Sequence, residues 1–131
     1  MPRLLDIMES ADDFIFDTLS QIRMDTWSRG RVVLLGDAAC CAAPSSGMGT
    51  SQAMAGAYVL AGELAAAAGD HGPAFAAFEK EMRDYAAENQ LIGRRAAEAF
   101  FAPGGEGAGD PEFTAPAEPP VETIELKGHQ L

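Results

Sequence analysis

The stretch GRVVLLGDAACCAAPSSGMGTSQA, residues 30–53, decides the fold of this chain. It begins with a β-branched and aliphatic run at residues 31–35, which is typical of a strand buried on both faces of a sheet. Gly36 and Asp37 end this run, and a loop of small residues follows them. The alanine-rich segment at residues 50–68 then predicts a helix. A strand, a loop and a helix in this order indicate an α/β fold.

The residues between the predicted strand and the predicted helix suit a ligand. Asp37 would stand at the carboxyl end of the strand, where open α/β sheets bind ligands, and its carboxylate can accept hydrogen bonds from ligand hydroxyls. Gly36 lets the backbone pass close to whatever is bound. The N–H groups of Gly49, Thr50 and Ser51 would point out of the helix start, which favours negative charge or a polarised carbonyl. We therefore expect a ligand rich in hydroxyls at one end and electron-accepting at the other.

Other segments predict a few further elements. A short helix is expected at residues 2–13, a strand at residues 14–24 and a turn at residues 28–30. The helix that ends at residue 68 has Gly69 as a candidate C-cap, and Pro73 opens a second helix. The apolar stripe of that second helix consists of Phe75, Phe78, Met82, Tyr85 and Ile92.

Charge and length divide the chain into two parts. The 131 residues are enough for one domain, expected at residues 1–102. Residues 103–131 are rich in Pro, Gly and acidic residues without a period, so we expect a disordered tail there. The net charge of −11 argues against nucleic acid and membranes as partners, because both attract basic surfaces.

Cysteine and histidine usage points to no metal site. Cys40 and Cys41 are adjacent, which offers neither a disulfide framework nor metal-ligand spacing, and a reducing cytoplasm is the expected compartment. Both thiols are expected to be small buried filler rather than reactive groups. His71 is expected in a loop and His129 in the tail. The N-terminus does not have the pattern of a signal peptide, and no run approaches the roughly 20 apolar residues of a membrane helix.

Residues 30–65, GRVVLLGDAACCAAPSSGMGTSQAMAGAYVLAGELA, resemble the second FAD-binding signature of the flavin-dependent aromatic monooxygenases, the p-hydroxybenzoate hydroxylase-like family. Residues 12–39 are similar to the last substrate-domain strand of that family, where it returns to the FAD domain. The fold that the resemblance implies is the C-terminal segment of a Rossmann-like FAD-binding domain. It would comprise two strands, a loop and two long helices.

The resemblance implies a cofactor site but no catalytic residue and no metal ligand. The strand-end Gly36 and Asp37 would bind the ribityl chain of FAD. Pro44 would lie beside the isoalloxazine, and the amides of the helix start would face its N1/O2 edge. The implied cofactor-binding residues are Gly36, Asp37, Ala38, Pro44, Gly47, Met48, Gly49, Thr50 and Ser51.

The chain departs from the family pattern in three ways. Cys40 stands where the family often has His, and Gly56 stands where it frequently has Asp. The chain also lacks the G-x-G-x-x-G motif that holds the FAD pyrophosphate, with the acidic residue beyond it, and the family's middle Asp-Gly motif. We therefore expect the C-terminal part of such an enzyme, which would need a complementing chain or would self-associate.

The function that the resemblance implies is FAD-dependent, NAD(P)H-using hydroxylation of an aromatic or polyketide-like small molecule. Two alternatives remain open: a non-catalytic flavin-site remnant that binds a partner protein, and a small helical interaction protein in which the motif is vestigial. At the level of residues, Asp37 could instead be a plain helix or turn cap. The loop that holds Pro44 could likewise be an ordinary one.

Overall fold

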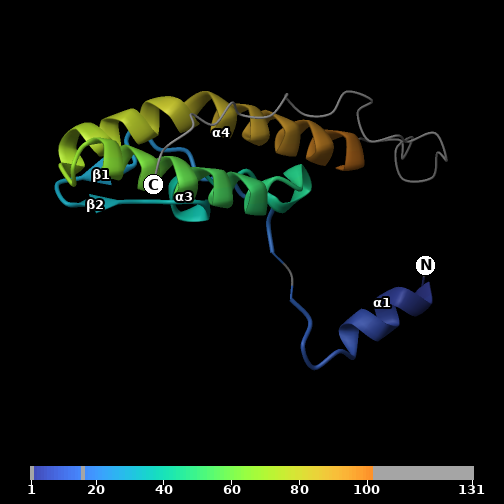
Figure 1. Cartoon of the computed structure of the whole chain (residues 1–131). Helices are drawn as coiled ribbons and strands as arrows, with labels where there is room; N and C mark the ends of the chain where they lie inside the picture. The colour runs from blue at the N-terminus through green and yellow to red at the C-terminus, as the bar shows by residue number, and fades with distance from the viewer. Residues whose placement is uncertain (1, 16, 102–131) are drawn as a thin grey trace.

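The computed structural model describes residues 2–15 and 17–101. In chain order the elements are α1 (Pro2–Glu9), β1 (Ser28–Arg29), β2 (Val32–Val33), α2 (Asp37–Cys40), the 3₁₀ turn η1 (Pro44–Ser46), α3 (Gly49–Ala66) and α4 (His71–Phe101). Helices α3 and α4 lie side by side, the β1–β2 hairpin lies at one end of this pair, and α1 stands apart (Figure 1). An α/β segment with two long helices is therefore present. The tail expected at residues 103–131 lies outside the described residues.

Helices α3 and α4 confirm the two long helices predicted from the sequence. Helix α3 ends at Ala66, two residues earlier than predicted. Beyond it, the N–H of Ala68 donates to the carbonyl of Ala65 (3.1 Å), and the N–H of Gly69 donates to that of Leu64 (2.9 Å). These bonds form a Schellman motif in which Ala68 (φ 49°) is the left-handed residue, directly ahead of the predicted cap Gly69 (φ 83°).

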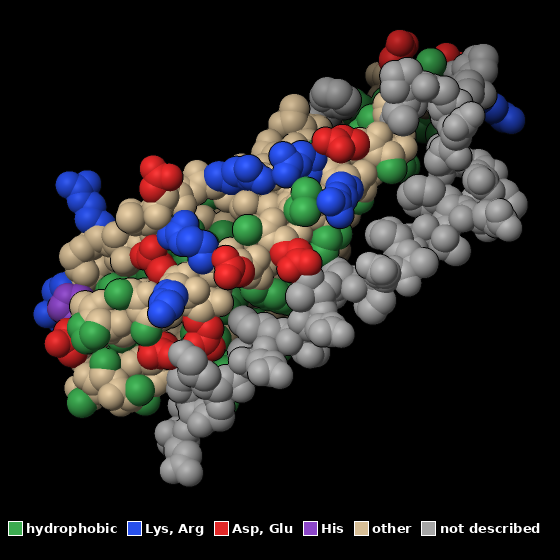
Figure 2. Space-filling view, turned by 90° about the horizontal axis from the view of Figure 1, so that it is seen from above, with side chains coloured by type: hydrophobic (Ala, Val, Ile, Leu, Met, Phe, Trp, Pro, Cys, Tyr) green, Lys and Arg blue, Asp and Glu red, His purple; other side chains and the backbone are tan. Residues whose placement is uncertain are grey.

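The core lies between α3, α4 and the chain around the hairpin and α2. Its buried members are Trp27, Ala39, Cys40, Val59, Phe78, Met82 and Ala86. In the predicted stripe of α4, the aromatic and methionine side chains as far as Met82 are buried, and Tyr85 and Ile92 are half-buried. The face of the molecule seen from above, over α4, carries acidic and basic side chains interspersed (Figure 2). The apolar stripe of α4 therefore faces the core, as its period predicts.

Gly56 of α3 is buried against this core. A Cβ at Gly56 would lie 3.0 Å from Cδ1 of Leu35 and 3.6 Å from Cε of Met82. The Asp that the resembling family frequently has here would therefore displace Leu35. Glycine in place of this Asp therefore allows α3 to pack tightly against Leu35.

The strand predicted at residues 14–24 is wrong, because the described residues of that segment form no strand. The N–H of Ile22 donates to the carbonyl of Cys41 (3.2 Å), which belongs to a loop. Phe14, Ile15 and Leu19 are exposed. An alternating pattern gives a strand only where a neighbouring strand supplies the ladder of hydrogen bonds, and here the neighbour is irregular backbone.

The strand predicted at residues 31–35 is present but shorter, and its burial on both faces is wrong. Strand β2 pairs antiparallel with β1, with Ser28 opposite Val33 and Arg29 opposite Val32. Gly30 (φ 60°) lies in the connecting turn, as predicted. Val32 is 63% exposed. In the described part of the chain the sheet has two strands only, so no further strand covers the outer side of β2.

The shorter elements differ in detail from the predictions. Helix α1 confirms the N-terminal helix but ends at Glu9 rather than at residue 13. His71 begins α4, so its assignment to a loop is wrong. The predicted loop at residues 37–49 contains α2 and η1. Within the described ranges, none of the helices has the length and apolar character needed to cross a bilayer, and no group of His, Cys, Asp and Glu could hold a metal ion.

Trp27 connects the hairpin to α4. Its indole packs against Phe78, with 5.8 Å between ring centroids, and the guanidinium carbon of Arg83 lies 4.9 Å above the indole. Arg83 also donates to the carbonyls of Met24 (3.2 Å) and Asp25 (2.9 Å). Arg83 therefore binds both the indole and the backbone that leads into it.

Glu79 adds a charged contact at the same place. The Ser28 hydroxyl donates to its Oε1 (2.6 Å), Arg83 donates to its Oε2 (2.9 Å), and the backbone N–H of Trp27 also donates to this carboxylate. Burial of Glu79 favours its neutral form, but these hydrogen bonds outweigh burial and hold the pKa of Glu79 below its usual value. The ionised carboxylate thus fixes β1 on α4.

This geometry predicts a specific loss of stability in acid. A carboxyl group with a lowered pKa stabilises the fold fully above its unfolded-state pKa of about 4.3, and the stabilisation is lost as the pH falls through the folded-state pKa. Between about pH 6 and pH 3 the unaltered chain should therefore lose about 1 kcal/mol more than Glu79→Gln, measured by urea unfolding. Glu88→Gln, at an exposed position of α4, is the control and should follow the unaltered chain. Parallel pH curves for the Glu79→Gln variant and the unaltered chain would contradict this role.

Candidate functional site

The connection from β2 to α2 depends on Gly36. Its backbone (φ 59°, ψ −135°) lies in a region that side chains with a Cβ avoid, and its carbonyl accepts from the N–H groups of Ala39 and Cys40, both at 3.0 Å. A Cβ at Gly36 would lie 3.2 Å from the Cβ of Ala53 on α3. Glycine therefore both turns the chain and lets it approach α3 closely.

Asp37 follows this turn, and its carboxylate is brought to the start of α3. Its Oδ1 lies 3.8 Å from the position that a Cβ on Gly49 would occupy. The cap of α2 is Gly36 and that of α3 is Met48, neither with a side-chain cap bond, and no described residue is found to donate to the Asp37 carboxylate. Among the described residues, then, Asp37 is not a plain helix cap. Asp37 is exposed.

The loop between α2 and α3 bends sharply at two places. Ala43 has φ 70° and ψ 150°, an uncommon conformation for alanine, and directly precedes Pro44. Gly47 (φ 66°) closes η1 by donating to the carbonyl of Pro44 (3.1 Å). The Ser46 hydroxyl donates to the Ala43 carbonyl (2.8 Å) and accepts from the N–H of Met48 (3.1 Å). The loop thus satisfies its own polar groups while it turns into α3.

Helix α3 begins without a capping side chain among the described residues. Its first intrahelical bond runs from the N–H of Gln52 to the carbonyl of Met48 (2.9 Å). The N–H groups of Gly49, Thr50 and Ser51 precede that bond and point out of the helix start. Together with the positive end of the helix dipole they form an arrangement that favours an anion or a polarised oxygen.

The predicted cofactor residues are thus gathered at one place, mostly in the open. Gly36 is buried, Met48 and Gly49 are half-buried, and the exposed residues are Asp37, Ala38, Pro44, Gly47, Thr50 and Ser51. The structure brings the residue after the strand run next to the helix start.

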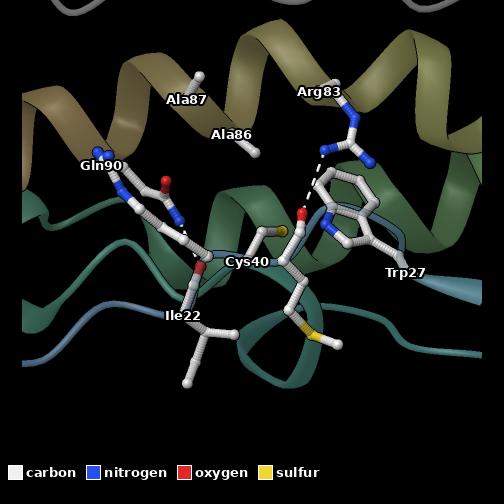
Figure 3. Close-up of a pocket in the computed structure, with 9 residues that line it drawn as sticks. Ile22, Trp27, Cys40, Arg83, Ala86, Ala87 and Gln90 are labelled. Atoms are coloured by element: carbon white, nitrogen blue, oxygen red, sulfur yellow. Dashed lines mark hydrogen bonds between the residues drawn. The ribbon is translucent and has the colours of Figure 1, made fainter.

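Two cavities lie elsewhere. One, of about 230 Å³, lies between α4 and the chain around Ile22 and Trp27, and the sulfur of Cys40 points toward it (Figure 3). Burial raises the pKa of Cys40 to about 11, so this thiol is protonated at neutral pH and fits the predicted role of filler. Cys41 is half-buried. The other cavity, of about 290 Å³, lies beside Ser45 and Gly93.

The sequence analysis missed three buried polar residues that hold the loop, namely Gln52, Asn89 and Gln90. Gln52 donates to the carbonyl of Cys40 (2.7 Å), and Asn89 donates to Oε1 of Gln52 (3.0 Å). A signal was present: Asn89 continues the spacing of the apolar stripe of α4, and a polar residue at a core position indicates a buried hydrogen bond.

Comparison with known proteins agrees with the motif. The FAD binding domain family matches residues 10–98. Uncharacterized protein Rv1260 of Mycobacterium tuberculosis is 54% identical over 90 residues, which are 69% of this chain and 24% of that protein. A flavin-dependent monooxygenase from an unknown prokaryotic organism is 45% identical over 100 residues, which are 76% of this chain and 26% of that protein.

A solved structure gives the same result for the fold. The crystal structure of tetracycline destructase Tet(55) superposes with a TM-score of 0.68 at 44% identity, covering 76% of this chain and 26% of that one. The chain thus spans about a quarter of the length of the relatives it matches.

The backbone at Gly36 predicts a graded effect of two glycine substitutions. Gly36→Ala should destabilise the fold by about 2 kcal/mol or more, because a Cβ there meets both a disfavoured backbone conformation and Ala53. Gly30→Ala is the matched control: its φ is similar, but nothing lies within 4 Å of the added Cβ. It should cost only about 1 kcal/mol. Urea midpoints measure both, and equal losses would mean that the contact with α3 is not tight.

Proposed function

Because this chain belongs to the FAD binding domain family, we propose that it is the FAD-binding portion of a flavin-dependent monooxygenase. We further propose that its hairpin and long helices are the C-terminal segment of a Rossmann-like FAD domain. The observation that carries the proposal is the juxtaposition of the Asp37 carboxylate with the start of α3. An acceptor of hydroxyl groups and a set of N–H donors then stand side by side.

The residues at this place fit FAD. Asp37 would accept hydrogen bonds from the hydroxyl-rich ribityl chain, which Gly36 and Ala38 let approach. The N–H groups of Gly49, Thr50 and Ser51 would donate to the N1/O2 edge of the ring system. Pro44 would lie against the ring, and Gly47 and Met48 would shape the turn beside it. When bound, the flavin supplies the redox chemistry that carries oxygen from O₂ to an organic substrate.

The substrate and the reductant are further proposals. The related structures are named tetracycline destructases, and several related proteins are named monooxygenases, which favours an aromatic or polyketide-like small molecule as substrate. We propose NAD(P)H as the reductant, as the family resemblance implies. In the described residues we assign no catalytic side chain, because the chemistry resides in the flavin.

Exposed apolar side chains favour a second candidate function, in which this chain is one subunit and associates with a complementing chain. Val32 on β2 is 63% exposed and Met54 on α3 is 69% exposed. The relatives are about four times as long as the part that this chain matches. We propose that a complementing chain, or a second copy of this one, covers these side chains.

The role of Asp37 leads to a binding prediction. Asp37→Ala should weaken FAD binding by about 1–3 kcal/mol, because ligand hydroxyls lose a charged acceptor. Titration of FAD, followed by the quenching of its fluorescence, measures the change. Asp84→Ala, at an exposed position of α4, is the control and should leave the affinity unchanged. Equal FAD affinity in the Asp37 variant and the unaltered chain would refute the role.

Turnover tests whether the chain acts alone. With FAD and NADPH but no partner, we expect weak flavin binding, with a Kd on the order of tens of micromolar or weaker, since only one end of FAD is held. Flavin-dependent NADPH oxidation should be absent. If the chain alone binds one FAD per molecule and oxidises NADPH, no complementing chain is needed.

A further inference from the structure

Three consecutive backbone carbonyls, at residues 40–42 where α2 ends and the loop ahead of η1 begins, each accept a hydrogen bond from a side-chain amide. Gln52 of α3 donates to the first (2.7 Å), Gln90 of α4 donates to the second (3.2 Å), and Gln21 donates to the third (3.1 Å). We call these three glutamines the amide clamp. The clamp reaches the loop from three different segments of the chain.

The clamp is itself held in place. Asn89 donates to Oε1 of Gln52 (3.0 Å), and Gln21 donates to the backbone carbonyl of Gln90 (2.6 Å). Gln90 also donates to the carbonyl of Ile22 (2.6 Å), and Figure 3 shows its side chain extending from α4 toward that residue. Gln52 and Asn89 are 1% exposed and Gln90 is 6% exposed. Buried, mutually bonded amides of this kind specify one arrangement of the backbone they contact.

Helix α4 makes a second contact with the loop at Gly93. A Cβ at Gly93 would overlap the carbonyl oxygen of Ala42 and lie 3.2 Å from Cβ of Ser46. The Ser45 hydroxyl donates to the carbonyl of Gly93 (2.8 Å). Only glycine at this position lets the helix lie directly against the loop.

We propose that the amide clamp and Gly93 are positioning residues for the flavin site, an inference that rests on the proposed function. Helix α4 holds the loop from behind, so Pro44, Gly47 and the start of α3 keep the arrangement that receives the ring. The clamp also draws the carbonyl oxygens of residues 40–42 into the interior. The partial negative charge of these oxygens is thereby kept away from the start of α3, whose N–H groups would donate to the electron-rich N1/O2 edge of the flavin.

The physical reason for using glutamines is the cost of burying carbonyl groups. The Cys41 carbonyl also accepts from the backbone N–H of Ile22 (3.2 Å), but an irregular loop has no regular ladder of backbone donors, and an unpaired buried carbonyl is costly. The amide side chains of Gln21, Gln52 and Gln90 satisfy these carbonyls in one geometry only. The hydrogen bonds that satisfy the loop carbonyls are therefore the same ones that fix the shape of the loop.

The test replaces Gln90 in the full chain with Leu, which has a similar volume but no donor. Hydrogen exchange should be about tenfold faster or more at the Ser46 and Gly47 amides, both bonded within the loop, while exchange within α3 stays unchanged. The Kd for FAD should rise about tenfold or more. Arg83→Leu is the matched control, because it also removes an α4 donor to two backbone carbonyls but leaves the loop untouched.

A second variant tests the same proposal without removing any amide of the clamp. Gly93→Ala keeps every amide of the clamp and displaces the loop by its added Cβ, so it should change loop exchange and FAD affinity in the same direction. If neither variant alters loop exchange more than Arg83→Leu does, the clamp does not hold the loop and the proposal is overturned. Faster loop exchange with unchanged FAD affinity would overturn the positioning role. Failure of the unaltered chain to bind FAD even at about 1 mM would instead overturn the proposed function, whereas the exchange measurement still decides the clamp.

Discussion

The described fold depends on one constraint: the first part of an irregular loop is buried against α3 and α4, and its backbone carbonyls need donors. Ala42 and Ala43 are buried, so water cannot serve the polar groups around them. Gln21 supplies the donor for Ala42, Gln52 and Gln90 supply those for Cys40 and Cys41, and the close approach of α4 requires glycine at position 93. The position of α4 along α3 is thereby fixed by the loop as much as by the apolar stripe between the helices.

The hairpin is attached to the same helix by a different kind of contact. Trp27 lies between Phe78 and the guanidinium of Arg83, and Arg83 also pairs with Glu79 (2.9 Å). The outer side of the hairpin, in contrast, leaves Val32 exposed. Trp27 and β1 are thus anchored on α4, whereas Val32 of β2 is covered by no described residue to the same extent and stays exposed. This asymmetry agrees with a chain that spans about a quarter of the length of its relatives.

At the candidate site, the residues that we propose to bind the flavin also shape the local structure. Gly36 makes a turn that residues with a Cβ disfavour, and the turn places Asp37 beside Gly49. A carboxylate near a helix N-terminus favours the helix by a few tenths of a kcal/mol to about 1 kcal/mol even without a ligand. Because no described residue is found to donate to it, that carboxylate keeps its capacity to accept hydrogen bonds from hydroxyl groups. The site is therefore preorganised by local backbone geometry, with a loop that α4 holds from behind.

The sequence by itself determined the elements whose signals are local. The alanine-rich segment and the stripe from Phe75 to Met82 predicted α3 and α4, because a helix satisfies its hydrogen bonds within the segment. The glycine and aspartate at residues 36 and 37 likewise marked the end of the strand run and placed a carboxylate directly after it. Tertiary structure alone decided the features that depend on contacts between residues far apart in the sequence. Residues 14–24 have the alternation of a strand but lie against a loop, and Gln90 meets Cys41 across 49 residues of chain. No local pattern encodes such pairings, since their free energy arises only when the segments meet.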